Sequence, residues 1–103
     1  MKQILVSLLK ENGFKECPIE SELHQSCNGL ILQRDWAKET DVVWYGKHTE
    51  TYSVRVFVNQ NSGICHVSYF HCGRECKDRW YNTVGKRTYN AIVETASNAG
   101  FEF

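Results

Sequence analysis

Hydrophobic and polar residues alternate most strictly in the middle of the chain. Residues 52–58 and 64–70 each alternate with period two, and the polar residues 59–63 separate them. Such alternation is typical of strands with one buried face, so this region predicts an antiparallel β-hairpin. Valines and tyrosines would point into the core. The opposite face would carry Arg55, Phe57, His66 and Phe70.

Apolar residues at helical spacing predict a helix on either side of this hairpin. The first, over about residues 2–12, is indicated by Ile4, Leu5, Leu8 and Leu9. The second is indicated by Tyr89, Ile92, Val93 and Ala96. Each pattern stops at a glycine followed by a phenylalanine, Gly13-Phe14 and Gly100-Phe101. Glycine in the left-handed conformation followed by an apolar contact is the Schellman ending of a helix.

Two more strands are expected, over residues 29–36 and 41–45, with turns at 37–40 and 46–49. Residues 15–28 read as a crossing loop with a short helical turn near 21–25. The element order is then α-β-β-β-β-α. Short connections favour a four-stranded antiparallel sheet with both helices on one face. We therefore expect one α+β domain over residues 1–103.

Composition restricts the function classes. The 103 residues include twelve Lys and Arg against twelve Asp and Glu, a formal net charge of zero, so no overall field attracts polyanions. The apolar start of the chain ends at Lys10 without a cleavage site, and no segment approaches the roughly 20 apolar residues that span a bilayer. Five cysteines favour reduced thiols over a disulfide framework. We expect a cytoplasmic protein without a membrane anchor.

The face with Arg55, Phe57, His66 and Phe70 is the first candidate site. If the helices cover only the opposite face, these side chains stay open for a partner. Aromatic side chains on a sheet can stack on single-stranded bases, or they can form the dry centre of a protein interface. The alternatives are that a loop folds over them or that the strands are buried on both faces.

Residues 74–87 are the second candidate site. They contain five cations against two acids. The cations are Arg74, Lys77, Arg79, Lys86 and Arg87. Lys86 and Arg87 near a helix start could meet a phosphate. Three net charges give only a shallow salt dependence, so a solvated, weakly basic surface is the competing interpretation.

From about Asp41 onward, the predicted element order resembles that of double-stranded-RNA-binding domains. In that family a Gly-Pro-x-His loop and a Lys-Lys-x-Ala-Lys helix start contact the RNA. Here the nearest matches are Gly46-Lys47-His48, without the proline and one residue, and residues 86–90, without the third cation. An extra strand at 29–36 and the long segment after Phe70 also depart from the pattern. The resemblance implies RNA contacts at these positions, and we assign no membership from it.

Several cysteines and histidines are candidates for metal binding or catalysis. Cys72 and Cys76 have the spacing of one zinc ligand pair, and His71 could add a third donor, but a second pair is missing. A Cys-His hydrolase needs a thiolate, a base and an orienting group, and no family signature surrounds these residues. We expect no metal, no cofactor and no catalysis.

The sequence favours a small binding module that engages a protein partner. Small neutral domains without catalytic motifs often act as adaptors, or as inhibitors of a larger complex, including those that phages and plasmids carry. The alternative is an RNA- or DNA-binding domain that uses the aromatic face and residues 74–87. A homodimer through the same face is a third possibility.

Overall fold

The structure, a computed structural model, describes residues 4–19, 28–44, 46–82 and 84–101. Its elements are α1 (Ile4–Glu11), β1 (Lys15–Cys17), β2 (Gly29–Val42), β3 (Gly46–Asn59), β4 (Cys65–His71), β5 (Arg74–Tyr81) and α3 (Lys86–Asn98). The strands form one antiparallel sheet in the order β1-β2-β3-β4-β5, in which strands that follow each other in the sequence are paired. This arrangement confirms the expected α+β class, with five strands in place of four.

The boundaries of two predicted strands are wrong. Residues 37–40, expected as a turn, lie inside β2, and residues 46–49, also expected as a turn, begin β3. The strand predicted over 41–45 does not form, because Asp41 and Val42 end β2. Residues 37–42 of β2 and 46–51 of β3 are exposed to water on both faces over most of their length. Their sequence therefore lacks the alternation of apolar and polar residues that marks a half-buried strand.

The segments predicted as irregular also hold strands. β1 lies within the expected crossing loop, while the helical turn expected near 21–25 falls outside the described residues. β5 follows β4 after a tight turn at Cys72-Gly73, where both residues have positive φ, 52° and 79°. Positive φ at both central residues suits the primed turns that join antiparallel strands. The fifth strand therefore depends on a two-residue turn.

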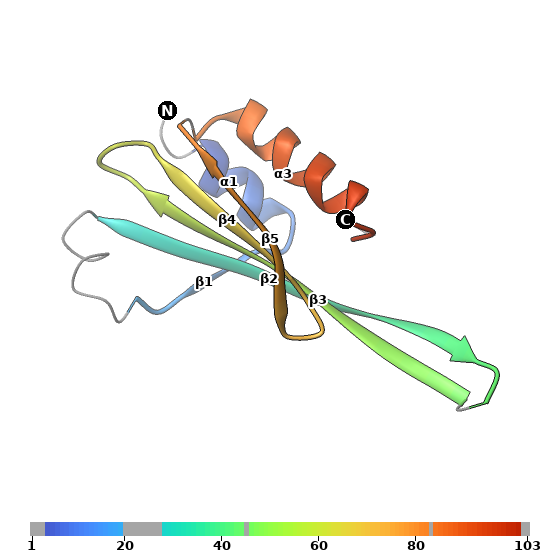
Figure 1. The fold of residues 1–103 in the computed structure, drawn as a ribbon. Coiled ribbons are helices and arrows are strands. Elements are labelled where there is room, and N and C mark those ends of the chain that lie inside the picture. The colour runs from blue at the N-terminus through green and yellow to red at the C-terminus, as the bar shows by residue number, and fades with distance from the viewer. Residues whose placement is uncertain (1–3, 20–27, 45, 83, 102–103) are drawn as a thin grey trace.

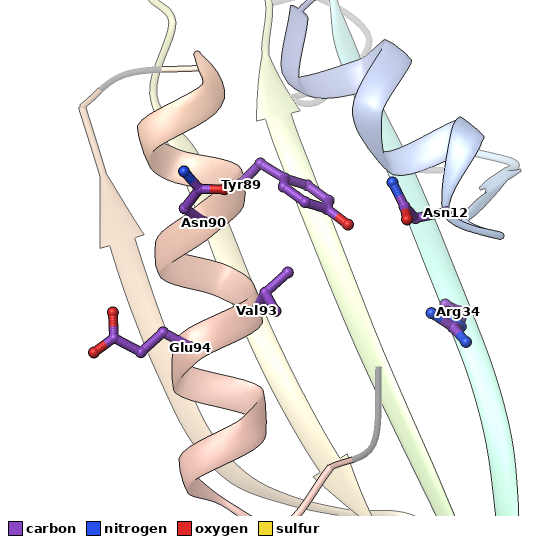
Figure 2. A pocket seen from close by; sticks show the side chains of 6 residues that line it. All are labelled: Asn12, Arg34, Tyr89, Asn90, Val93 and Glu94. Carbon is purple, nitrogen blue, oxygen red and sulfur yellow. The ribbon is translucent and has the colours of Figure 1, made fainter.

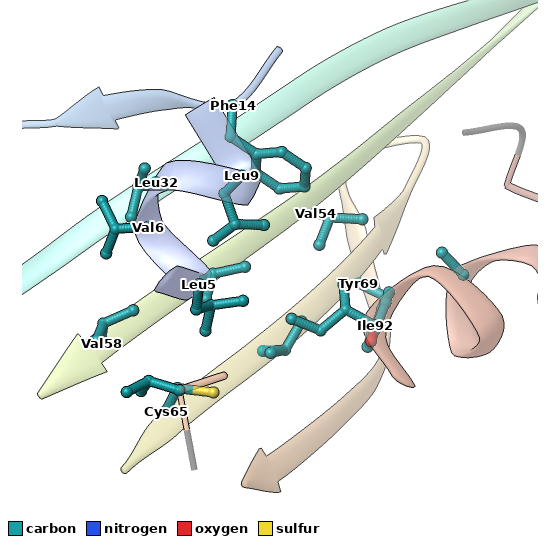
Figure 3. Packing of buried hydrophobic residues seen from close by; sticks show 14 of the residues in the cluster. Leu5, Val6, Leu9, Phe14, Leu32, Val54, Val58, Cys65, Tyr69 and Ile92 are labelled. Carbon is teal, nitrogen blue, oxygen red and sulfur yellow. The ribbon is translucent and has the colours of Figure 1, made fainter. Parts of the chain in front are cut away.

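Both helices pack on the same face of the sheet, as Figure 1 shows. Leu5 and Leu9 of α1, together with Ile92 and Ala96 of α3, are fully buried in one cluster with the sheet (Figure 3). The sheet contributes a row of side chains at 0% exposure: Leu32, Val54, Val56, Val58, Cys65, Val67 and Tyr69. The alternation read from the sequence thus places one side of β3 and β4 in the core.

The two predicted helix endings are confirmed. The backbone N–H of Phe14 donates to Leu9 O at 3.0 Å, and that of Phe101 donates to Ala96 O at 2.8 Å. Both phenylalanine side chains are 3% exposed, so each helix stops where its last apolar residue folds back onto the core.

The paired strands β2 and β3 continue beyond the rest of the sheet. β4 pairs with β3 only from Tyr52 to Val58, whereas β2 and β3 stay paired for six further residues on each strand, up to Val42 opposite Gly46. At about 3.4 Å per residue, this ribbon extends about 20 Å. Figure 1 shows it projecting away from both helices. We call residues 37–44 and 46–51 the arm.

Aromatic rings fix the base of the arm. The ring of Tyr52 lies 4.9 Å from that of Phe101 and 4.8 Å from that of His71, measured between centroids. Trp36, opposite Tyr52, packs edge-on against Phe101 at 5.7 Å. The end of α3 therefore holds the two strands at the point where they leave the body.

Core packing gives the first prediction. Replacing Leu9, which is fully buried, by alanine removes contacts with the sheet and should lower the free energy of unfolding by about 2–5 kcal/mol. Ile4→Ala, on the same helix at 41% exposure, should cost less than about 1 kcal/mol. Urea unfolding of both variants measures the difference. Equal losses would contradict the burial of this helix stripe.

Candidate functional site

The face of the sheet opposite the helices has no helix over it among the described residues. We call it the open face. It is formed by Lys15 and Cys17 of β1, Ile31, Gln33 and Asp35 of β2, Ser53, Arg55 and Phe57 of β3, His66, Ser68 and Phe70 of β4, and Glu75, Asp78 and Trp80 of β5. Each of these side chains alternates with a residue of the covered face.

A hydrogen-bonded network runs across β2 and β3 on the open face. Arg55 Nε donates to Gln33 Oε1 at 2.8 Å, and Gln33 Nε2 donates to Asp35 Oδ1 at 2.7 Å. Ser53 Oγ donates to the same oxygen of Asp35. These bonds, followed by the charge of Arg55, hold the pKa of Asp35 below its ordinary value. The network links the guanidinium of Arg55 to Asp35 through Gln33.

Aromatic rings occupy the other half of the open face. The Arg55 guanidinium lies 5.6 Å from the centre of the Phe70 ring, within reach of a cation–π contact. His66 stacks on Trp80 with 4.3 Å between ring centroids, and its Nε2 lies 3.0 Å from Asp78 Oδ2. Trp80 is 65% exposed. A large indole surface therefore faces water beside charged groups that are already positioned.

Two hollows lie along this face. One of about 240 Å³ is lined by Gln33, Ser53, Arg55, Phe70 and Gly73. The other, of about 420 Å³, is lined by Gly13, Lys15, Cys17, Gln33 and Asp35. They share Gln33, so the face has relief into which side chains of a partner can fit.

The nine site residues predicted from the sequence fall into three groups. Arg55, Phe57, His66 and Phe70 lie together on the open face. Arg74, Lys77 and Arg79 lie opposite His71, Tyr69 and Val67 of the covered face, and therefore point to the helix side of β5. Lys86 and Arg87 are exposed on the first turn of α3. The cations of residues 74–87 thus do not extend the aromatic surface, because strand alternation turns them away from it.

Trp80 belongs to the open face and was missed in the sequence. It pairs with His66 across the two strands, so its position follows from the register of β5. The charged neighbours Asp78 and Arg79 favour the interpretation of this segment as a basic surface, so the sequence did not predict a strand there. The tip of the arm was missed as well. There Val43 is 92% and Trp44 is 87% exposed.

A groove between the helices is the third concave region. Its volume is about 400 Å³, and Figure 2 shows the ring of Tyr89 reaching from α3 toward α1 across it. Arg34 from β2, Asn12 after α1, and Asn90, Val93 and Glu94 from α3 complete the lining. Burial raises the pKa of Tyr89. The groove mixes both charges with two amides, and it lies on the opposite side of the sheet from the open face.

The cysteines and histidines of residues 65–76 lie on different surfaces. Cys65 is fully buried on the covered face, where burial raises the pKa of its thiol to about 12. His66, its neighbour in the chain, lies on the open face. Cys76 Sγ donates to Tyr69 O at 3.4 Å. In the part of the chain that the structure describes, no three His, Cys, Asp or Glu side chains are grouped as metal ligands.

Comparisons with protein-family models, curated proteins and solved structures found no match to this chain. The tripeptide Gly46-Lys47-His48, matched to an RNA-contacting loop in the sequence, is the start of β3 in the arm. None of the described helices has the length and apolar character needed to cross a membrane.

The one-sided sheet predicts a contrast between residues on its two faces. Tyr69→Ala removes a side chain at 0% exposure and should cost about 3–5 kcal/mol of folding free energy. Trp80→Ala, on the open face at 65% exposure, should cost about 1 kcal/mol or less. Chemical unfolding of both variants makes the comparison. A loss at Trp80 as large as that at Tyr69 would show that the open face is packed.

The Asp35 network predicts a pH dependence. Because the folded-state pKa of Asp35 lies below its ordinary value of about 3.9, its contribution to stability is present above that pH and is lost as the pH falls through the folded pKa. Asp35→Asn should therefore be less stable than the native chain by about 1 kcal/mol or less at neutral pH, and equally stable near pH 2. Urea midpoints across this range test it, and a gap that widened on acidification would contradict it.

Proposed function

We propose that this chain is a small non-catalytic binding module that engages a protein partner through its open face. The observation that supports the proposal is that one face of the sheet carries exposed Trp80, which stacks on His66, together with Arg55, which is hydrogen-bonded to Gln33 and lines a hollow. Trp and Arg are the residue types that most often dominate the energy of protein interfaces. Holding Arg55 in place before binding lowers the entropy lost when a partner docks.

The charges on this face favour a protein over a nucleic acid. Lys15 and Arg55 stand against three acidic residues on the same face, Asp35, Glu75 and Asp78, and the whole chain has a net charge of zero. Nucleic-acid sites need an excess of cations along the phosphate path. Here the basic side chains of β5 point to the opposite side of the sheet, so the aromatic rings have no such path beside them.

The proposal includes no reaction. The candidate thiol Cys72 lies in the turn that joins β4 to β5, while the candidate base His66 lies six residues earlier on the open face, about 20 Å away along the strand. The other candidate base, His71, stacks on Tyr52 on the helix side of the sheet, so these groups do not converge on one substrate. We propose an adaptor, or an inhibitor that occludes a larger complex, acting in the cytoplasm. The four described cysteines are unpaired with one another, which fits a reducing compartment.

Partner capture tests the proposal. The chain, carrying an affinity tag, is incubated with extract of the cell that naturally makes it, and retained proteins are quantified. Arg55→Ala and Trp80→Ala should each lower retention of a specific partner about tenfold or more, since each removes a predicted anchor. Lys10→Ala, on the exposed side of α1, is the matched control and should retain the partner fully.

Fluorescence anisotropy with labelled single-stranded RNA, double-stranded RNA and duplex DNA decides against the alternative. We expect no binding at physiological salt. Tight binding that weakens with salt and is lost in Lys86→Glu or Arg87→Glu would replace the protein-partner proposal by the nucleic-acid function. Retention of the same partner by Arg55→Ala, Trp80→Ala and the control would also contradict the proposal.

A further inference from the structure

The arm ends in apolar side chains, and no other part of the described chain packs on them. Its stem is polar, with Lys38 and Lys47 against Glu39, Asp41 and Glu50, whereas Val43 and Trp44 at the tip are 92% and 87% exposed. A two-stranded ribbon alone is only marginally stable in water. A projecting ribbon with a polar stem and an indole at its tip therefore suits contact with a surface that lies beside the body of the molecule.

The open face of a second copy has the length that the arm requires. Beyond the Trp36–Tyr52 pair at its base, the arm has six residue pairs, ending at Val42 and Gly46. In the other direction, β3 and β4 remain paired for six further residues, from Ser53 to Val58. A two-fold axis through the base of the arm therefore lays each arm along the full open face of the other copy. Both contacts form at once, which closes the assembly as a dimer.

The same register brings complementary groups together. Glu39 lies three pairs outward from the base of the arm, and Arg55 lies three residues inward, so Glu39 of one protomer comes over the partner's Arg55. The tip reaches beyond the rung that holds Phe57, His66 and Trp80, where the face is aromatic. Glu39, which also lies 3.8 Å from Lys47 Nζ of its own arm, thus meets a cation of the partner, and Trp44 meets aromatic rings.

We propose that two copies of this chain form a dimer in which the arm of each lies across the open face of the other. The zero net charge removes long-range repulsion between copies. The proposal rests on the proposed function in that it uses the same protein-binding face. The second copy occupies that face until another partner displaces it.

Sedimentation equilibrium of the purified full chain tests the dimer. The mass should rise with concentration from 12.0 kDa to twice that value over the micromolar range and above. Trp44→Ala should weaken the dimer about tenfold or more, because it removes the tip from the interface. Ile4→Ala, an exposed apolar residue on the helix side, is the control and should dimerise like the native chain. Circular dichroism checks that each variant is folded.

A charge exchange tests the register. Glu39→Arg and Arg55→Glu should each weaken the dimer, since each places like charges opposite one another twice. The double variant should recover most of the lost affinity, because both opposite-charge contacts are restored. Dimerisation that ignores Trp44→Ala and the charge exchange would overturn this arrangement.

A native chain that stays at 12.0 kDa at every concentration would overturn the dimer outright, while leaving partner capture through Arg55 and Trp80 unaffected. Conversely, Trp44→Ala could weaken a dimer while neither the native chain nor any variant retains another protein. That result would support the homodimer and contradict the proposal of a different protein partner. Competition between a captured partner and the dimer is the result expected if both proposals hold.

Discussion

The fold depends on burying one row of apolar side chains from β3 and β4 beneath two helices. Each helix has a single apolar stripe, so α1 and α3 together can cover one face of the sheet and no more. The valines at 54, 56 and 58 satisfy that requirement on β3. The open face and the arm are the parts of the sheet that these two helices do not cover.

Among the described residues neither helix covers the second face of the sheet, and this has a chemical consequence. The open face holds side chains that tolerate water but also offer large contact areas, such as Trp80 and the stacked His66. The hydrogen bonds around Asp35 and Arg55 keep its polar half ordered without a covering layer. The face thus combines aromatic rings with two cations and three acidic groups, Asp35, Glu75 and Asp78.

The arm extends the same logic beyond the helices. Past the Tyr52 rung no third strand pairs with β2 and β3 among the described residues, so the ribbon relies on its cross-strand pairs and on the aromatic cluster at its base. Its polar stem keeps it soluble as a projection. At its tip the apolar side chains of Val43 and Trp44 are exposed to water.

Much of this architecture could be predicted from the sequence. The alternation over residues 52–58 and 64–70 predicted the central hairpin, and the Gly-Phe pairs predicted both helix ends, because burial leaves a period in the sequence. The arm and β5 left no such period. The arm is exposed on both faces for most of its length. β5 is an edge strand, and most of its side chains, which include five charged residues, are exposed. For the same reason the sequence grouped nine site residues that the strand register divides between two faces and a helix.

The central claim is that the described residues cover the sheet on one side only. It is tested most directly by NMR with a soluble paramagnetic probe, at a concentration low enough to keep the chain monomeric. Phe70 and Tyr69 are neighbours in β4 that point to opposite faces, and Trp80 lies on the same open side as Phe70, opposite His66. Our account predicts strong broadening of the Trp80 ring signals, weaker broadening of Phe70 and none of Tyr69. Equal protection of all three rings would show that both faces are covered and would contradict the account.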